Sequence, residues 1–347
     1  MTAWKRFAGG KIFWPVVALV ALLVANTVKT TTFVNIRVQD GHLFGALIDI
    51  LRNSSPLLLV AVGMTLVIAT RGIDLSVGAV VAISGAVACS FIASSGDPTG
   101  VGTVLTAVAI AALLSLVLGV WNGFLVSVVG IQPIIATLVL MTAGRGIAML
   151  ITGGQITTIN SPPYKMIGSG YWLAVPLAVL IAGGLFAIVA TLTRRTALGM
   201  LIESVGINPQ ASRLAGVQSR TIIWTVYALS GVFAGIAGLM ISSNVMAADA
   251  NNAGLFIELD AILAVVIGGT SLAGGKFSLA GTLVGVLVIQ TLTLTVTILG
   301  VPPAVTPLFK AVVVIAVCIM QAPVVRNRIA SRGRAPVSAP VPVTVGL

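Results

Sequence analysis

The sequence predicts an all-α polytopic membrane protein with about ten transmembrane helices and both termini in the cytoplasm. Of its 347 residues, 58% are hydrophobic and only 8% are charged, and the mean hydropathy is +1.13. A soluble domain carries about 25% charged residues. The apolar runs are continuous rather than alternating, and a helix of about 20 such residues crosses the hydrocarbon core. Helices are therefore expected rather than a barrel.

Ten apolar runs are expected to span the membrane. In chain order they are 12–30, 54–70, 75–94, 101–121, 131–153, 172–193, 221–242, 259–275, 277–299 and 306–322. A re-entrant segment is a second interpretation of the region 123–153, because this region contains Gln132, Pro133 and Arg145. The longest polar loop, 194–220, is too short to bury a core, so residues 1–322 are expected to form one transmembrane domain.

The basic residues set the expected orientation. With ten spans both termini, the loop 194–220 and Lys276 share one side, and all of them are basic, whereas 243–258 carries Asp249 and Glu258 without a cation. The positive-inside rule then places the termini in the cytoplasm. The cations of the termini are Lys5, Arg6, Lys11, Arg326, Arg328, Arg332 and Arg334.

The net charge of +11 follows from this topology and is not taken as a sign of nucleic-acid binding. The first apolar run with its basic flank also fits a signal peptide, but the many spans that follow favour a start-transfer helix. The segment 323–347 is rich in Pro and Val and is expected to be a disordered, basic cytoplasmic tail.

Catalytic and metal-binding side chains are scarce. His42 is the only histidine, and Cys89 and Cys318 both lie within apolar runs, where a small buried hydrophobe is the simplest interpretation. We therefore expect no catalytic residue and no metal site, and a membrane enzyme is disfavoured.

The loop 194–220 is expected to contain a short helix. Asn208 is a good N-cap, Pro209 suits the first helical turn, and Gly216 is well placed to end the helix. Two interpretations stay open on these grounds: an amphipathic connector at the membrane surface, or a coupling helix that docks into a separate motor subunit.

The glycine-rich stretch 268–276 is not a nucleotide-binding P-loop. The pattern requires Gly at position 270 and Ser or Thr at position 277, where Thr270 and Phe277 stand. If ATP is used, another subunit must bind it.

The stretch RGIDLSVG, residues 71–78, places two charges between apolar runs. Arg71 and Asp74 are three residues apart, a spacing at which they can pair on a helix. One interpretation is a topological anchor, with Asp74 at the N-terminus of the next span. The other is a broken helix that lines the solute path, supported by a faint echo between 73–83 and 258–269 that run in opposite directions.

Amide and hydroxyl side chains in apolar surroundings suit the path of a neutral, hydroxyl-rich solute. Asn122, Gln132 and Thr137 are such residues, although Asn122 follows Trp121 and also fits the membrane interface. With five Trp and three Tyr in the chain, a tight aromatic sugar-stacking site is not expected.

Three stretches, 63–79, 197–217 and 258–285, closely resemble the membrane subunits of bacterial sugar ABC importers of the ribose, xylose and galactose type. The resemblance extends over about 45–322. Three shorter stretches, 38–51, 159–162 and 247–262, look most like permeases of galactofuranose importers.

The resemblance implies the ABC-importer permease fold in the bacterial inner membrane. It also implies a second permease, identical or paralogous, an ABC ATPase that holds ATP and Mg, and a periplasmic sugar-binding protein, with no cofactor on this chain. The residues that match the family's ATPase-docking loop are Glu203, Gly206, Asn208, Ala211, Arg213 and Gly216. Pro209 and Gln210 depart from the polar or acidic residues of many relatives.

We therefore predict the permease subunit of an ATP-driven importer, which forms the path for a monosaccharide such as galactofuranose. The side chains expected along that path are Asp74, Asn122, Gln132, Thr137, Asn251, Asn252, Glu258 and Asp260. Ribose, xylose or another small neutral solute is the alternative substrate. An ion-coupled secondary transporter is the competing class, disfavoured because such proteins need ionisable residues deep in their spans.

Overall fold

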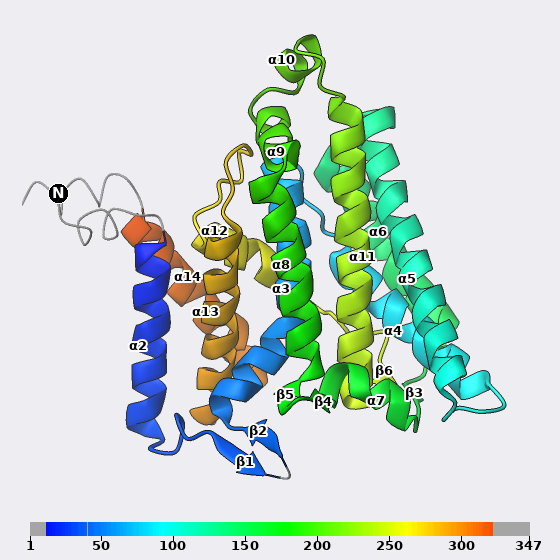
Figure 1. Ribbon diagram of the computed structural model, residues 1–347, viewed down its shortest axis with the longest axis vertical. Coiled ribbons are helices and arrows are strands. Elements are labelled where there is room, and N and C mark those ends of the chain that lie inside the picture. The colour runs from blue at the N-terminus through cyan, green and yellow to red at the C-terminus, as the bar shows by residue number, and fades with distance from the viewer. Residues whose placement is uncertain (1–11, 40, 322–347) are drawn as a thin grey trace, which may run out of the picture.

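The computed structural model describes residues 12–39 and 41–321, and it is a helical bundle (Figure 1). The helices are α2 (Phe13–Lys29), α3 (Ala46–Ala69), α4 (Val77–Ser94), α5 (Val101–Phe124), α6 (Pro133–Ile151), α7 (Pro162–Ser169), α8 (Leu177–Arg195), α9 (Ala197–Ile207), α10 (Pro209–Leu214), α11 (Ser219–Val245), α12 (Ile257–Ile267), α13 (Leu279–Ile298) and α14 (Thr306–Gln321). A π-helical turn, Leu125–Val129, extends α5, and a 3-10 turn, Pro303–Val305, precedes α14. The basic residues of the two termini and the expected disordered tail lie outside the described residues.

Seven of these helices are long and apolar enough to cross a membrane: α3, α4, α5 with its π-helical extension, α6, α8, α11 and α13. The expectation of about ten full spans is confirmed only in this coarser form. The other three expected spans correspond to shorter helices, α2, α12 and α14. The clearest error is 259–275, because α12 ends at Ile267 and its 11 residues extend only about 16 Å. A glycine-rich turn follows, with Gly269, Gly274 and Gly275 in the left-handed region.

Two other span boundaries were wrong. The helix expected at 54–70 begins at Ala46, because α3 accommodates Asp49, Arg52 and Pro56 within its first turns. The span expected at 172–193 begins only at Leu177, since residues 171–176 form a short hairpin. In the region 123–153 a continuous helix α6 takes the place of a re-entrant piece.

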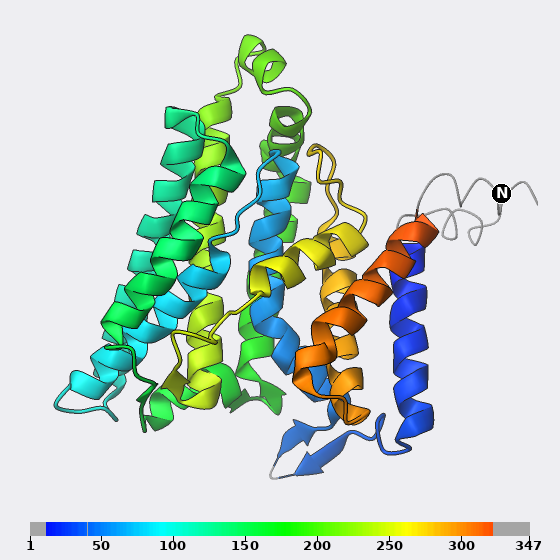
Figure 2. The same cartoon turned by 180° about the vertical axis from the view of Figure 1, so that it is seen from behind.

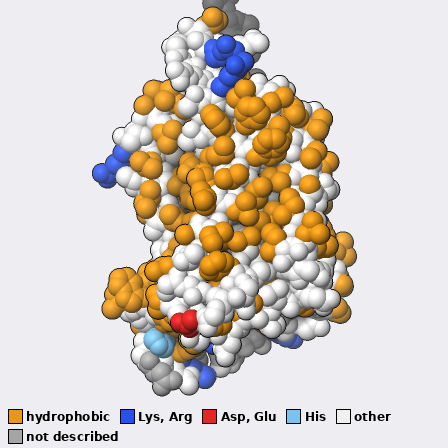
Figure 3. Space-filling view, turned by 90° about the vertical axis from the view of Figure 1, so that its right-hand side faces the viewer, with side chains coloured by type: hydrophobic (Ala, Val, Ile, Leu, Met, Phe, Trp, Pro, Cys, Tyr) orange, Lys and Arg blue, Asp and Glu red, His pale blue; other side chains and the backbone are white. Residues whose placement is uncertain are grey.

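Helices α3 and α11 form the centre of the bundle, and α11 packs against α3, α4 and α5. Small residues allow close contacts here: a methyl group on Gly119 of α5 would lie 2.6 Å from the carbonyl oxygen of Tyr227 in α11. Such small-residue interfaces are typical of helices that associate in lipid. Large apolar side chains cover the outer surface, with charges near its ends (Figure 3).

Two connections run inside the bundle instead of staying at its surface. After α3 the chain turns back, and residues 70–76 lead to the start of α4 part-way down the bundle (Figure 2). From the opposite end, residues 246–256 lead inward to the start of α12 (Figure 2). The two helix starts meet, because a methyl group on Gly78 of α4 would overlap a carboxylate oxygen of Glu258 in α12.

The two ends of the bundle differ in structure. Three antiparallel strand pairs lie at the end opposite α10 (Figure 1). They are β1 (Arg37–Gln39) with β2 (His42–Phe44), β3 (Thr157–Thr158) with β6 (Ala247–Ala248), and β4 (Tyr171–Trp172) with β5 (Val175–Pro176). The start of α2 and the end of α14 lie at the end that carries α9 and α10 (Figure 1). The described ends of the chain therefore share one side with the loop 194–220.

Candidate coupling surface and translocation path

The loop 194–220 forms two helices, α9 and α10, and α10 projects from the bundle (Figure 1). Asn208 caps α10 as the sequence predicts: its side-chain oxygen accepts the backbone N–H groups of Gln210 and Ala211, each at 3.0 Å. Gly216 follows the helix with a φ of +86°, a conformation that glycine adopts without strain. Both helix-boundary predictions are confirmed in this geometry.

The predicted coupling residues have different environments. Ala211, Arg213 and Gly216 are exposed on or just after α10, where a partner can reach them. Glu203 is half-buried beside a hollow between α9 and the start of α13. Gly206 is buried and faces the bundle, so its role is internal.

Gly206 packs tightly against the bundle. A methyl group at this position would overlap the carbonyl oxygen of Ala69, the last residue of α3, and would lie 2.6 Å from the backbone nitrogen of Gly275. The Gly275 N–H donates to the same Ala69 carbonyl at 2.9 Å. Three distant segments therefore meet around one carbonyl group.

Arg71 joins this contact rather than pairing with Asp74. Its guanidinium donates to the carbonyl oxygen of Ile207 at the end of α9, at 2.6 Å. Its backbone φ of +65° is uncommon for a residue with a side chain. The pairing that the Arg71–Asp74 spacing allows is therefore not formed, because the two residues do not share a helix and Arg71 turns toward the loop.

Asp74 is the centre of a buried polar network. It is 2% exposed, and it accepts the Ser76 backbone N–H (3.1 Å), the Ser76 hydroxyl (2.6 Å) and the Ser230 hydroxyl of α11 (2.8 Å). Asn122 of α5 donates to the Ser76 hydroxyl at 2.8 Å. The hydroxyl of Thr137 in α6 donates to the Ile73 carbonyl at 3.2 Å.

The structure thus brings together three of the predicted path residues, Asp74, Asn122 and Thr137, but inside the protein. Asn122 is 1% exposed and Thr137 is fully buried. In this conformation their side chains hold segment 70–76 against α5, α6 and α11. Ser230 was not recognised from the sequence, since a serine within an apolar helix is common.

The other predicted path residues lie apart from this network. Gln132 is exposed at the start of α6, and Asn251 is exposed in the connection before α12. Asn252 donates its side-chain amide to Asp249 at 2.7 Å, a bond that holds the pKa of the Asp249 carboxyl below its usual value. Asp260 accepts from Lys310 of α14 at 2.6 Å.

Glu258 is buried in the first turn of α12, and one of its oxygens lacks a hydrogen-bond donor among the described residues. Arg145 of α6 lies near it and donates to the carbonyl oxygens of Ala250 (3.1 Å) and Ala253 (2.6 Å). This arginine fixes the connection before α12 to α6, a role that its position in the sequence did not reveal.

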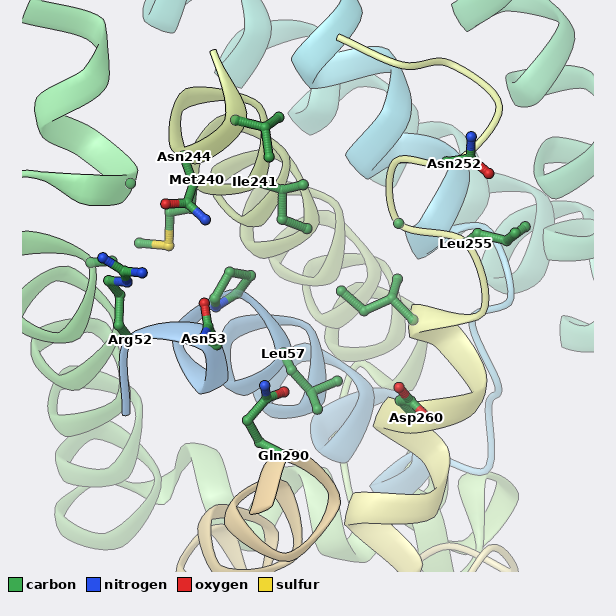
Figure 4. Close-up of a pocket in the computed structure, with 16 residues that line it drawn as sticks. Arg52, Asn53, Leu57, Met240, Ile241, Asn244, Asn252, Leu255, Asp260 and Gln290 are labelled. Atoms are coloured by element: carbon green, nitrogen blue, oxygen red, sulfur yellow. The ribbon is translucent and has the colours of Figure 1, made fainter. Parts of the chain in front are cut away.

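A cavity of about 290 Å³ with a mixed polar and apolar lining lies between α3, α11, α12 and α13 (Figure 4). Asn252 and Asp260 are the two predicted path residues that line it. The polar side chains that sequence analysis missed are Arg52, Asn53, Asn244 and Gln290. Asn53 and Asn244 stood at the borders of expected spans, and Gln290 within one. Their amides offer donors and acceptors without a net charge.

The bundle, its internal polar groups and its projecting helical loop define a multi-pass membrane transport protein. The chain matches the family described as "Branched-chain amino acid transport system / permease component" over residues 46–318, and it belongs to this family. The prediction of an ABC-importer permease, distinct from the ATPase, is therefore confirmed.

Curated relatives cover nearly the whole chain. The chain is 49% identical to the galactofuranose transporter permease YtfT of Escherichia coli, over 89% of this chain and 90% of that protein. It is 43% identical to the fructose import permease FruF of Bifidobacterium longum (95% and 93% covered) and 38% identical to the ribose import permease RbsC of E. coli (86% and 90% covered). No solved structure matches the chain.

Proposed function

We propose that this permease forms the path for a neutral monosaccharide, with galactofuranose as the first candidate. The three relatives described above carry names for galactofuranose, fructose and ribose, all neutral sugars. The family description names branched-chain amino acids, which are zwitterions. The identity of 49% to the galactofuranose permease supports a sugar over an amino acid.

The observation that carries this proposal is the set of amide side chains in the lining of the cavity. Asn53, Asn244, Asn252 and Gln290 present amides toward it. Amides can exchange hydrogen bonds with sugar hydroxyls in either direction. The two charged lining residues, Arg52 and Asp260, have opposite signs, and Asp260 is already neutralised by Lys310. Such a lining suits an uncharged polyol.

The loop 194–220 is proposed to dock into an ABC ATPase, which binds ATP and Mg in place of this chain. This assignment puts α9, α10 and both chain termini in the cytoplasm, and it puts the strand pairs on the periplasmic side, where a sugar-binding protein would deliver the substrate. A second permease, identical or paralogous, completes the path in the inner membrane. Exposed Ala211 and Arg213 support α10 as the part that enters the ATPase.

A pull-down from native membranes tests the docking. The full chain is purified in mild detergent and its partners are identified by mass spectrometry, and the experiment is repeated with Ala211→Glu/Arg213→Glu, which changes two exposed residues of α10. We expect an ATPase to co-purify with the wild type and to be lost from the double variant. Gly184→Leu is the control, because a side chain at Gly184 of α8 meets open space. Equal ATPase recovery from all three proteins would refute the docking surface.

Uptake into proteoliposomes that hold the co-purified complex tests the substrate. Labelled galactofuranose, ribose, xylose, fructose and leucine are compared, each with its binding protein on the outside. We expect ATP-dependent uptake of one sugar, and a raised half-saturation concentration for Asn53→Ala and Gln290→Ala. Uptake of leucine alone, or sugar uptake by the isolated chain driven by an ion gradient, would overturn the proposal.

A further inference from the structure

Two tight contacts at the ends of one short segment suggest how the coupling loop acts on the bundle. The segment comprises the seven residues 70–76 between α3 and α4. Its outer end begins beside Ala69, whose carbonyl is enclosed by Gly206 and Gly275. Arg71 adds the 2.6 Å hydrogen bond to Ile207. A displacement of α9 therefore moves this end directly.

The inner end is held to the bundle by hydrogen bonds of a different kind. The Asp74 side chain accepts a hydrogen bond from the Ser230 hydroxyl of α11 at 2.8 Å. The hydroxyl of Ser76, a residue that also binds Asp74, accepts a hydrogen bond from the Asn122 side chain of α5. These hydrogen bonds are shielded from water, where a donor or acceptor left without its partner is costly. The start of α4 is thus fixed to α5 and α11.

The middle of the segment has little freedom. Gly72 lies against the Tyr227 ring of α11, so that a methyl group there would be 2.5 Å from the Tyr227 hydroxyl oxygen. The Ile73 carbonyl accepts from Thr137. A short segment that is held at both ends and along its length transmits displacement rather than absorbing it.

We infer that segment 70–76 is the mechanical link between the coupling loop and the helices that open and close the path, and that Asp74 and Ser230 are positioning residues in this link. The inference rests on the proposed function. It assigns the buried pair to energy coupling rather than to contact with the solute.

The test measures coupling in the assembled importer. The complex of permease, ATPase and binding protein is reconstituted, and sugar uptake and ATP hydrolysis are measured in the same vesicles. The variants are Ser230→Ala, Gly206→Ala and their combination. Ser243→Ala is the matched control, because Ser243 is also a buried serine of α11 but its hydroxyl donates only to its own helix, to Met240 at 3.1 Å.

We expect Ser230→Ala to lower the sugar imported per ATP hydrolysed by about tenfold, the effect of losing one buried hydrogen bond in the coupled state. ATP hydrolysis itself should change little, and Ser243→Ala should resemble the wild type. If the contacts of Gly206 and Ser230 act in one link, the double variant should import no less sugar per ATP than the more severe single variant. Two independent defects would instead multiply their losses.

A wild-type ratio of uptake to hydrolysis in Ser230→Ala overturns the inference, as does multiplicative loss in the double variant. Ser230 is buried in α11 and is not part of the docking loop, so it decides the question even if Gly206→Ala fails to fold or to bind the ATPase. If the wild-type complex binds no ATPase or imports no sugar, the proposed function fails instead.

Discussion

Replacing Asp74 by alanine should destabilise the protein by about 3 kcal/mol, because three buried donors lose their acceptor at once. These donors are the Ser76 N–H, the Ser76 hydroxyl and the Ser230 hydroxyl, at 3.1, 2.6 and 2.8 Å from the carboxylate. Asp74 is 2% exposed, so water does not readily take its place. Each buried donor without a partner costs about 1 kcal/mol or more.

Asp74→Asn separates the hydrogen bonds from the shape of the side chain. It retains one acceptor oxygen for Ser76 but turns the other acceptor into a donor, which faces the Ser230 hydroxyl. The Ser230 hydroxyl can reverse and accept, so we expect a loss of about 1 kcal/mol.

Thermal unfolding in lipid nanodiscs, followed by tryptophan fluorescence, measures both variants. The alanine variant should lower the midpoint by about 6 °C and the asparagine variant by about 2 °C. Asp97→Ala is the control: Asp97 bonds Thr99 in an exposed loop, and its loss should cost less than about 0.5 kcal/mol. If Asp74→Ala unfolds at the same midpoint as Asp97→Ala, the buried network does not stabilise the fold.

Three further predictions follow from other contacts. Gly119→Leu should separate α5 from α11, because even a methyl group would lie 2.6 Å from the Tyr227 carbonyl oxygen; its detergent-extracted yield should fall well below that of Gly184→Leu, and equal yields would contradict the close packing. Lys310→Ala should destabilise more than the double variant Lys310→Ala/Asp260→Ala, because the single change leaves the Asp260 charge uncompensated; a thermal double-mutant cycle checks this, and simple additivity would argue against the pair. Asn208→Ala should weaken α10 by about 1 kcal/mol and reduce ATPase co-purification, whereas Asn208→Ser retains a cap; equal recovery with both variants would show that the cap is not needed for docking.

Local chemistry explains what could be predicted from the sequence. The cap at Asn208 and the helix stop at Gly216 depend on residues within a few positions of one another, and both were found as expected. The apolar runs located the helices because each run must span the hydrocarbon. The prediction of a membrane span at 259–275 failed because the second half of this run is a glycine-rich turn. Hydropathy alone does not distinguish that turn from a helix.

The candidate site was predicted only in part. Asp74 and Asn122 were recognised as polar residues in apolar surroundings, but Ser230, which lies 156 positions from Asp74, was not. Gln290 stands in an apolar run whose lipid-facing and protein-facing sides are equally hydrophobic. In a soluble protein the polar face of a helix would reveal its rotation, but in a membrane this contrast is weak. Which amides meet in one cavity is therefore decided by helix packing.

The starts of α4 and α12 meet, and a buried acid lies at each: Asp74 just before α4 and Glu258 in the first turn of α12. Both helices begin there, from connections that enter from opposite ends, and Gly78 packs directly on Glu258. A helix start carries unpaired N–H groups and a partial positive charge, which favours carboxylates nearby. Under the proposed function, the passage of a sugar past this meeting point requires that segments 70–76 and 246–256 move. Segment 70–76 meets the coupling loop through Ala69 and Arg71, and the turn that follows α12 meets it through Gly275, so both helices whose starts meet are joined to that loop.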